Sequence, residues 1–258
     1  MRTLVVAGAL ALGLASLPLT AADAGSTWRV TVKASTHQVV VGKKLTLQGH
    51  VRPGAAAAGT ALVVQEKFKP GAKWKPAKTK AKVSQSGTYK ATIKPTKAFV
   101  HAYRVLMPAT KSHAKGVSPT VKVTVYAWTS LVDQDSANDT RMEFGTVHIN
   151  GKAYRDSVWN DYGDVGTIEF NVNRDCTELR GTFGLSDDST TGGQGEVSVE
   201  ADGTSVYSKT FDVGQSVVRS IKLDPAPLKV RLEAHSTSTV DGTAGWGAFG
   251  APQVLCTR

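Results

Sequence analysis

Hydrophobic and polar residues alternate along most of the chain after residue 26. In the first half the alternating segments are WRVTVKA (28–34), KLTLQGHV (44–51), ALVVQEKF (61–68), GTYKATIK (87–94), HAYRVLM (101–107) and TVKVTVY (120–126). Successive side chains of a β-strand point to opposite faces, so this pattern predicts short strands with one buried face. Gly, Pro and Ser separate the segments, and no long run has helical spacing. We expect a β-sandwich of about 100 residues.

The second half has the same pattern. In TIEFNVN (167–173) the residues Ile168, Phe170 and Val172 share one face. In LKVRLEAH (228–235) we expect Leu228, Val230, Leu232 and Ala234 to point inward. The Asp202-Gly203 step between EVSVE and TSVYS predicts a tight hairpin. The fold class expected for the whole chain is therefore all-β, with two β-sandwich domains.

The N-terminus is typical of an exported protein. Arg2 precedes an apolar run from Leu4 to Leu19, and Ala22-Asp23-Ala24 has the form of a cleavage site. These features predict a secretory signal peptide over residues 1–24, and hence a secreted, extracellular protein that could associate with the cell wall. No later segment has the length and apolar character of a membrane span.

Charge divides the chain at one position. Residues 27–126 contain 19 Lys or Arg and a single acid, Glu66, whereas residues 127–258 contain 11 basic and 19 acidic residues. So abrupt a change of sign predicts two domains, 27–126 and 127–258, with separate surface roles. The two oppositely charged halves could also dock on each other through contacts that salt would weaken.

The chain has two cysteines, Cys176 and Cys256. An even number in an exported chain favours one disulfide, which would tie the C-terminal tail to an interior strand. The alternative is a pair of free buried thiols.

The first half resembles the Ig-like sandwich domains of bacterial surface and secreted proteins. The resemblance rests on VGKKLTLQGHV, SGTYKATI and AYRVLMPAT, and on Trp74, Gly87-Thr88-Tyr89 and Tyr103-Arg104. It spans about residues 28–126. It implies a spacer or adhesive module without an active site.

The second half of the chain contains an ordered set of short motifs: an Asn-Gly-x-x-Tyr entry, an Asp-Asp loop, a Gly-x-Val strand, an Asp-Gly hairpin and a late Trp. Their residues are Asn150, Gly151, Tyr154, Asp187, Asp188, Gly195, Val197, Asp202, Gly203 and Trp246. In this order of motifs the second half, about residues 128–256, resembles the NPCBM family of carbohydrate-binding modules. The resemblance implies a galactose-binding-like jelly roll of the kind commonly attached to glycoside hydrolases, with a carbohydrate such as a galactose-type glycan as partner.

One segment departs from that family. The family's Gly-x-x-His-Ala-like segment is replaced by RDSVWNDYGDVG, which contains no His, so no sugar specificity carries over. If a sugar binds, the side of the binding site that this segment forms would have to consist of Trp159, Asn160, Asp161 and Tyr162. Aromatic rings stack on sugar faces, and polar groups bond sugar hydroxyls. Trp246 could also contact the sugar. The alternative for Trp159 and Trp246 is a packing role.

Two groups of acids raise other hypotheses. Asp187 and Asp188 could contact a sugar or a structural calcium ion, or only shape a turn; neighbouring strand residues face opposite ways, so they are poorly placed as a catalytic pair. Asp133, Asp135 and Asp139 could begin a calcium loop, but the distant bidentate Glu is missing, and a solvated linker is the preferred interpretation. Otherwise we expect no cofactor.

The lysine-rich segment EKFKPGAKWKPAKTKAK predicts a polyanion-binding surface. Its candidate residues are Lys67, Lys69, Lys73, Lys75, Lys78, Lys80 and Lys82. The last three share one parity and would line one strand face. The field of such a basic domain attracts anionic cell-wall polymers, although a merely solubilising surface is the alternative. Lys outnumbers Arg 16 to 3 in this half and no nucleic-acid motif occurs, so specific nucleic-acid recognition is not expected.

These observations favour a secreted, non-catalytic protein with a glycan-binding jelly roll and a basic Ig-like module that associates with anionic envelope material. The rival is a structural or protein-interaction module that binds no sugar. An enzyme ranks third, because no catalytic constellation can be assembled from the sequence.

Overall fold

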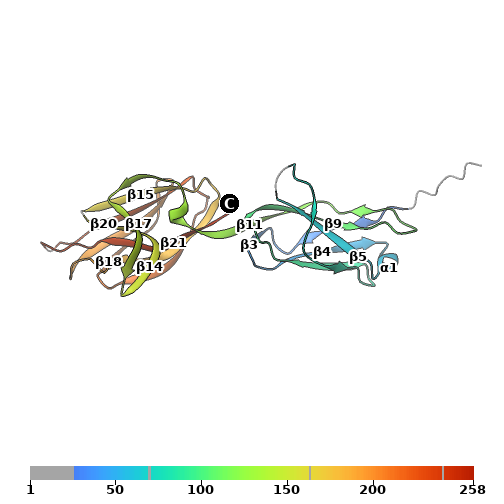
Figure 1. Ribbon diagram of the computed structural model, residues 1–258, viewed down its shortest axis with the longest axis horizontal. Coiled ribbons are helices and arrows are strands. Elements are labelled where there is room, and N and C mark those ends of the chain that lie inside the picture. The colour runs from blue at the N-terminus through green and yellow to red at the C-terminus, as the bar shows by residue number, and fades with distance from the viewer. Residues whose placement is uncertain (1–25, 69–70, 163, 240) are drawn as a thin grey trace, which may run out of the picture.

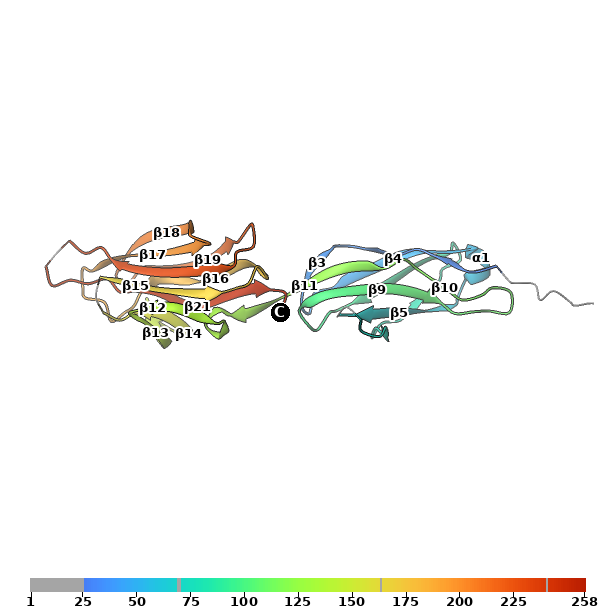
Figure 2. The same ribbon diagram turned by 90° about the horizontal axis from the view of Figure 1, so that it is seen from above.

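The computed structural model describes residues 26–68, 71–162, 164–239 and 241–258. The predicted signal peptide and Lys69 lie outside these residues. Strands dominate the described chain, and the helical elements there are α1 (Gly54–Ala57) and the 3₁₀ turn η1 (Leu131–Asp133). Two β-sandwiches lie end to end along the long axis in both views (Figures 1 and 2). The all-β, two-sandwich fold class is confirmed.

The N-terminal sandwich consists of two facing sheets. One contains β1 (Arg29–Val30), β2 (Lys33–Ala34), β4 (Leu45–Arg52) and β8 (Thr88–Ile93). The other contains β3 (Gln38–Val40), β11 (Val121–Ser130), β9 (Phe99–Met107) and β5 (Ala61–Lys67), with the short strands β6 (Lys75–Pro76), β7 (Ala81–Lys82) and β10 (Gly116–Val117) beside them. β3 pairs parallel with β11, and the other pairs are antiparallel. This is an Ig-like arrangement of strands.

The apolar residues of the alternating segments form the core of this sandwich. Leu45 and Leu47 of β4 are fully buried against Tyr103 and Val105 of β9 and Val123 of β11 in one cluster. No disulfide supports this sandwich, because both cysteines lie in the other half of the chain.

The C-terminal sandwich also consists of two antiparallel sheets. The first contains, in spatial order, β13 (Met142–Ile149), β14 (Lys152–Asn160), β21 (Gly247–Cys256), β16 (Cys176–Leu185) and β19 (Ser216–Lys222). The second contains β12 (Ser136–Thr140), β15 (Val165–Asn171), β20 (Lys229–Ser236), β17 (Gln194–Ala201) and β18 (Thr204–Asp212). Their facing sides enclose one large core, in keeping with the predicted jelly roll.

Most of the predicted inward positions are correct. Ile168, Phe170 and Val172 are buried, as are the Val, Leu and Ala predicted to point inward from β20. Leu228 is the exception, because its side chain is 44% exposed. It precedes β20, where its backbone accepts hydrogen bonds from Val172 and Asn173, and it therefore lies at the rim of the sandwich.

Strand β11 belongs to both sandwiches. Its residues from Val121 to Tyr126 pair with β9 and β3, and those from Ala127 to Ser130 pair with β21. The change of partner falls between Tyr126 and Ala127, where the charge of the sequence changes sign. One continuous strand therefore joins the two halves (Figure 1).

Two further sequence predictions concern the disulfide and the Asp202-Gly203 hairpin. Cys176 and Cys256 form a disulfide between the first residue of β16 and the last of β21, which are also register partners. Asp202 and Gly203, both with positive φ, form the two-residue turn between β17 and β18. Both predictions are confirmed.

Candidate functional site

The β13–β14 hairpin folds over the outer face of the first sheet. Its pairing shifts register between Gly145 and Val147, which bends the hairpin. Beyond the bend, Val147 and Ile149 form a small second core with Ala248, on the side of β21 away from the main core. A Cβ on Gly184 would lie 2.9 Å from Ile149 Cγ2. The hairpin therefore packs directly on the bare backbone of the sheet.

Asp187 holds the tip of this hairpin in place. Its Oδ2 accepts a hydrogen bond from the Gly151 backbone N–H at 2.8 Å, and its own N–H donates to the His148 carbonyl at 2.9 Å. The exposed Asp188 instead receives its backbone contact within its own turn, where its N–H donates to Ser186 Oγ at 3.2 Å. Asp188 therefore only shapes its own turn, whereas Asp187 anchors the β13–β14 hairpin.

The glycine-rich segments around Trp246 are closely packed. A Cβ on Gly245 would lie 2.2 Å from the Gln194 carbonyl carbon, and one on Gly193 would lie 2.3 Å from the Ala244 oxygen. Trp246 joins this arrangement by donating its backbone N–H to Ser189 Oγ at 2.9 Å. Gly193 and Gly245 therefore allow backbone packing between segments about 50 residues apart in the chain.

Trp159 and Asn160 are the last two residues of β14. Trp159 is half-buried, pairs with Ala248 and packs its ring 3.6 Å from the Cβ position of Gly145, so it belongs to the small second core. Asn160 is 1% exposed on the opposite face, and its Oδ1 has no hydrogen-bond partner among the described residues.

Asp161 and Tyr162 follow where the strand ends. Tyr162 is 61% exposed, and the Arg141 guanidinium lies 5.8 Å from the centre of its ring. The Oδ1 of Asp161 is buried and, like that of Asn160, lacks a partner within the part of the chain that the structure describes. Buried polar atoms are nearly always hydrogen-bonded in folded proteins, and other described residues, such as Thr129 and Ser130, also have unpaired oxygens. The exposed Tyr162 ring distinguishes this end of the strand. We call Asp161, Tyr162 and Arg141 the strand-end corner.

The structure thus brings together part of the predicted sugar site. The Asp187–Asp188 turn adjoins Trp246, since the Ser186 N–H donates to the Trp246 carbonyl at 2.8 Å. Trp159 lies beside the same end of β21. Asn160 points to the interior instead. The sequence analysis did not identify Arg141 as a site residue. Its position just before β13 brings it near Asn160, because the next residue, Met142, pairs with Asn160.

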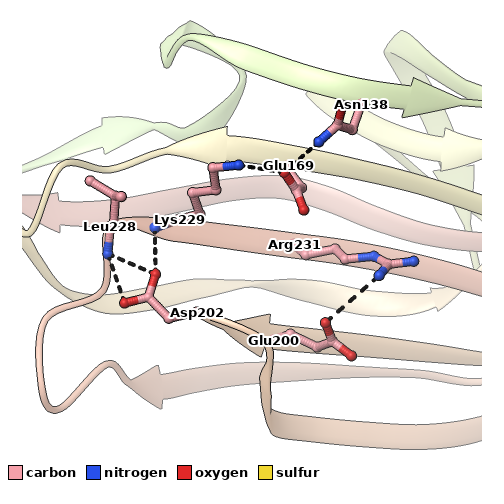
Figure 3. Close-up of polar contacts among 7 residues, drawn as sticks. All are labelled: Asn138, Glu169, Glu200, Asp202, Leu228, Lys229 and Arg231. Carbon is pink, nitrogen blue, oxygen red and sulfur yellow. Dashed lines mark hydrogen bonds and ion pairs between the residues drawn. The ribbon is translucent and has the colours of Figure 1, made fainter.

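The outer face of the second sheet carries charges that are paired with one another (Figure 3). Lys229 Nζ lies 3.0 Å from Glu169 Oε2, which also accepts a hydrogen bond from Asn138 at 2.7 Å. Arg231 lies 2.9 Å from Glu233 and 3.9 Å from Glu200. This face therefore satisfies its own charges and offers little to an ionic ligand.

Two carboxyl groups on this side have lowered pKa values. Hydrogen bonds from Lys229 and then from Asn138 lower the pKa of Glu169. The pKa of Asp202 is lowered by the backbone N–H groups of Lys229 and Leu228, which donate to its carboxylate at 2.9 Å (Figure 3). Asp202 thereby joins the β17–β18 turn to the start of β20.

The lysine-rich segment lies beside β5 and β8. Lys67 lies 5.0 Å and Arg104 4.3 Å from the ring centre of Trp74, so residues of the Ig-like motif meet here. Ala77, Ala81 and Val83 are buried, and the intervening residues Lys78, Lys80 and Lys82 are exposed. Between residues 77 and 83 only Ala81–Lys82 forms a strand, so Lys78 and Lys80 lie on irregular chain instead of the strand face that we expected. Lys73 and Lys75 are also exposed.

The described ranges contain no group of three or more His, Cys, Asp or Glu side chains that could hold a metal ion. Asp133 ends η1 and Asp139 belongs to the exposed strand β12, whereas Asp135 lies on the short connection between them. Two of the three acids therefore lie on short regular elements in place of the expected linker. Among the same residues no helix has the length and apolar character that crossing a membrane needs.

Comparison with known proteins gives distant structural likenesses. No protein-family model and no curated protein matches the chain. A structure of the CBM51-2 and INT domains from Clostridium perfringens ZmpB is 8% identical, with a TM-score of 0.42, over 62% of this chain and 38% of that one. CBM51 from Clostridium perfringens GH95 in complex with methyl-galactose is 11% identical, with a TM-score of 0.39, over 49% of this chain and 99% of that one. CBM36 in complex with calcium and xylotriose is 14% identical, with a TM-score of 0.29, over 50% and 98%.

The chain spans less than half the length of the first of these structures. Likenesses this distant carry no argument about the site, so the function is argued below from the chain's own residues.

Proposed function

We propose that the C-terminal sandwich is a carbohydrate-binding module and that the strand-end corner contacts the sugar. The observation that carries this proposal is the largely exposed Tyr162 ring directly after Asp161, a half-buried residue whose Oδ1 lacks a partner among the described residues. An exposed ring stacks on the apolar face of a sugar, and a carboxylate beside it bonds the sugar's hydroxyl groups. Arg141 would hold the ring from one side.

The role proposed for the whole chain is binding without catalysis, outside the cell. The basic N-terminal sandwich would associate with anionic envelope polymers, and the signal-peptide pattern of residues 1–24 supports export. A galactose-type glycan is the first ligand to test. Asp187 and Trp246 support the fold around the site in this proposal.

A glycan array with the full chain tests the carbohydrate proposal. We expect binding to at least one neutral glycan, lost in Tyr162→Ala and retained in Tyr162→Phe, because the phenylalanine keeps the stacking ring. Asp161→Asn should weaken binding by about tenfold, since a charge-assisted hydrogen bond contributes about 1.5–3 kcal/mol. Unfolding curves of the variants show whether they keep the fold.

Two outcomes would contradict the proposal. Absence of binding to every neutral glycan on the array, with and without calcium, would favour the protein-interaction alternative. Glycan binding that Tyr162→Ala leaves unchanged would move the site elsewhere on the sandwich.

A further inference from the structure

The outer face of the sheet formed by β2, β4 and β8 contains a groove of about 780 Å³. Lys33, Gln48 and Lys90 lie in one row across it, because Gln48 pairs with Lys33 on one side and with Lys90 on the other. His50 and Thr88 form the next row, and Lys82 of β7 borders the same groove. We call this hollow the β4–β8 groove.

A local break in the edge strand creates the groove. The edge strand is interrupted at Thr31 and Val32, between β1 and β2. A Cβ on Gly49 would lie 2.0 Å from the Thr31 oxygen, so the carbonyl of the edge segment lies directly against the bare backbone of β4 there. The Tyr89 hydroxyl donates a hydrogen bond of 2.5 Å to that oxygen, and the Thr31 N–H donates to the His50 carbonyl at 2.9 Å. The hollow is therefore held in shape by backbone contacts before any ligand arrives.

The groove has positive charges and no acidic side chain. Three lysines line it, whereas the one acid of residues 27–126, Glu66, lies on β5 in the other sheet. Cationic side chains without an acidic partner that converge on a concave surface attract an anionic ligand, and the ligand does not have to displace an internal carboxylate. The paired charges of the C-terminal sandwich provide the contrast.

The side chains between the lysines indicate which polyanion fits. Gln48, Ser84 and Thr88 line the groove and can exchange hydrogen bonds with hydroxyl groups. Tyr89 is 4% exposed and its hydroxyl is already bonded to Thr31, so the groove presents no open aromatic ring for a nucleobase. A polymer of hydroxyl-bearing units with regular negative charges can form ion pairs with the lysines and hydrogen bonds with the polar side chains.

We propose that the β4–β8 groove binds one segment of a linear anionic polysaccharide, with Lys33, Lys82 and Lys90 at its acidic groups and Gln48 and Thr88 at its hydroxyls. This proposal rests on the association with anionic polymers proposed above and assigns it a place and a ligand class. It moves the centre of binding away from the lysine-rich segment, of which only Lys82 lines the groove.

A neighbouring hollow of about 600 Å³ provides the rival location. Lys75, Lys78, Lys94 and Lys97 line it, but Glu66 and the ring of Phe68 line it too. Thr79 Oγ1 donates to the Thr92 carbonyl at 2.8 Å and fixes the lysine-rich segment along β8 between the two hollows. A carboxylate inside the hollow repels an anionic chain, so the β4–β8 groove is the better fit.

Binding of the full chain to polygalacturonate and dextran sulfate at low salt tests the proposal, with neutral dextran and single-stranded DNA as comparison ligands. Three pairs of substitutions change the net charge equally: Lys33→Glu with Lys90→Glu in the groove, Lys75→Glu with Lys78→Glu in the rival hollow, and Lys43→Glu with Lys44→Glu as an exposed control in the turn before β4. We expect the groove pair to lower the affinity for the anionic polysaccharides by about tenfold or more and to reduce the slope of log K against log salt concentration. The other two pairs should have smaller effects, equal to each other. Thr88→Val should weaken polysaccharide binding without changing that slope.

Each other result overturns a defined part of the account. If the wild-type chain binds neither anionic polysaccharide, the proposed association itself fails. If it binds and the groove pair behaves like the control pair, or the Lys75 and Lys78 pair has the larger effect, the groove assignment fails while the association stands. If single-stranded DNA binds as tightly as the polysaccharides through the same lysines, the polysaccharide is the wrong occupant. Thermal unfolding of each pair shows whether the fold survives, and Thr88→Val probes the groove without a charge reversal.

Discussion

Asp187 and Asp188 are neighbours in the chain with different contacts. Asp187 bonds the backbone of a hairpin 36 residues away, and Asp188 remains within its own turn. A side chain that satisfies a distant backbone N–H contributes to stability, whereas an exposed side chain without such a contact contributes little.

We therefore expect Asp187→Ala to lower the free energy of unfolding by about 1 kcal/mol and to speed amide hydrogen exchange at Gly151. Asp188→Ala, its matched control, should change neither. Hydrogen exchange of the two variants measures this directly, and equal protection of Gly151 in both would show that Asp187 does not hold the hairpin.

Asp202 makes the stability of the chain depend on pH. Its pKa is lowered in the folded protein by the backbone N–H groups of Lys229 and Leu228, so its contribution is present above the ordinary Asp pKa of about 4 and is lost as the pH falls through the lowered value. Asn at this position tolerates the positive φ of the turn but carries no charge to titrate.

Asp202→Asn should therefore be less stable than the wild-type chain near neutral pH, and the difference should shrink as the pH falls below about 4. Urea unfolding at several pH values measures it. A stability difference that stays constant down to the acid end would mean that the carboxylate charge is not responsible.

Among the elements, the disulfide joins the first residue of β16 to the last residue of β21, and these two cysteines are 80 residues apart in sequence. Closing a loop of this length restricts the unfolded chain and contributes about 4 kcal/mol. We expect Cys176→Ser with Cys256→Ser to lose roughly this amount in urea unfolding and to keep the folded far-UV spectrum. A loss below about 1 kcal/mol would mean that the strand pairing of β16 and β21 already supplies the constraint.

The segments before β17 and β21 pack backbone against backbone. Gly245→Ala should lower stability by about 1–3 kcal/mol, because the new Cβ meets the Gln194 backbone and no flexible side chain can yield. Gly203→Asn is a suitable control, since nothing lies within 4 Å of its Cβ position and Asn accepts the positive φ. Thermal unfolding compares the two, and equal losses would contradict the packing explanation.

The alternation of residues predicted the strands and most of their inward faces, because a half-buried strand imposes a period of two on its own sequence. It predicted the inward positions of β15 and failed at Leu228, which lies where the strand has not yet begun. The Asp202-Gly203 turn and the cysteine pair were predictable for the same reason: their signals are local or unique in the chain.

Features that depend on distant partners were not predictable. The backbone packing of Gly193 is one such feature, because its partner around Gly245 lies some 50 residues further along. The β4–β8 groove depends on the Thr31 carbonyl against Gly49 and on the row of Lys33, Gln48 and Lys90, which only the strand pairing establishes. For the proposed sugar site, the sequence pointed to residues 159–162 but not to which of these side chains remain exposed.

At the scale of the whole molecule, one continuous strand joins two sandwiches of opposite charge. The basic sandwich has an acid-free groove, and the acidic sandwich pairs its charges internally and exposes an aromatic corner. The account therefore assigns two chemically different ligands to two separate surfaces: a neutral glycan to the strand-end corner and an anionic polysaccharide to the groove.

The most direct test measures both ligands against both surfaces in the full chain, by titration calorimetry at low and high salt. We predict that Tyr162→Ala abolishes binding of the neutral glycan and leaves the anionic polysaccharide bound, and that Lys33→Glu with Lys90→Glu does the reverse. We also expect salt to weaken only the binding of the polysaccharide. Loss of both ligands in either folded variant, or equal salt dependence of the two, would contradict the assignment of separate surfaces.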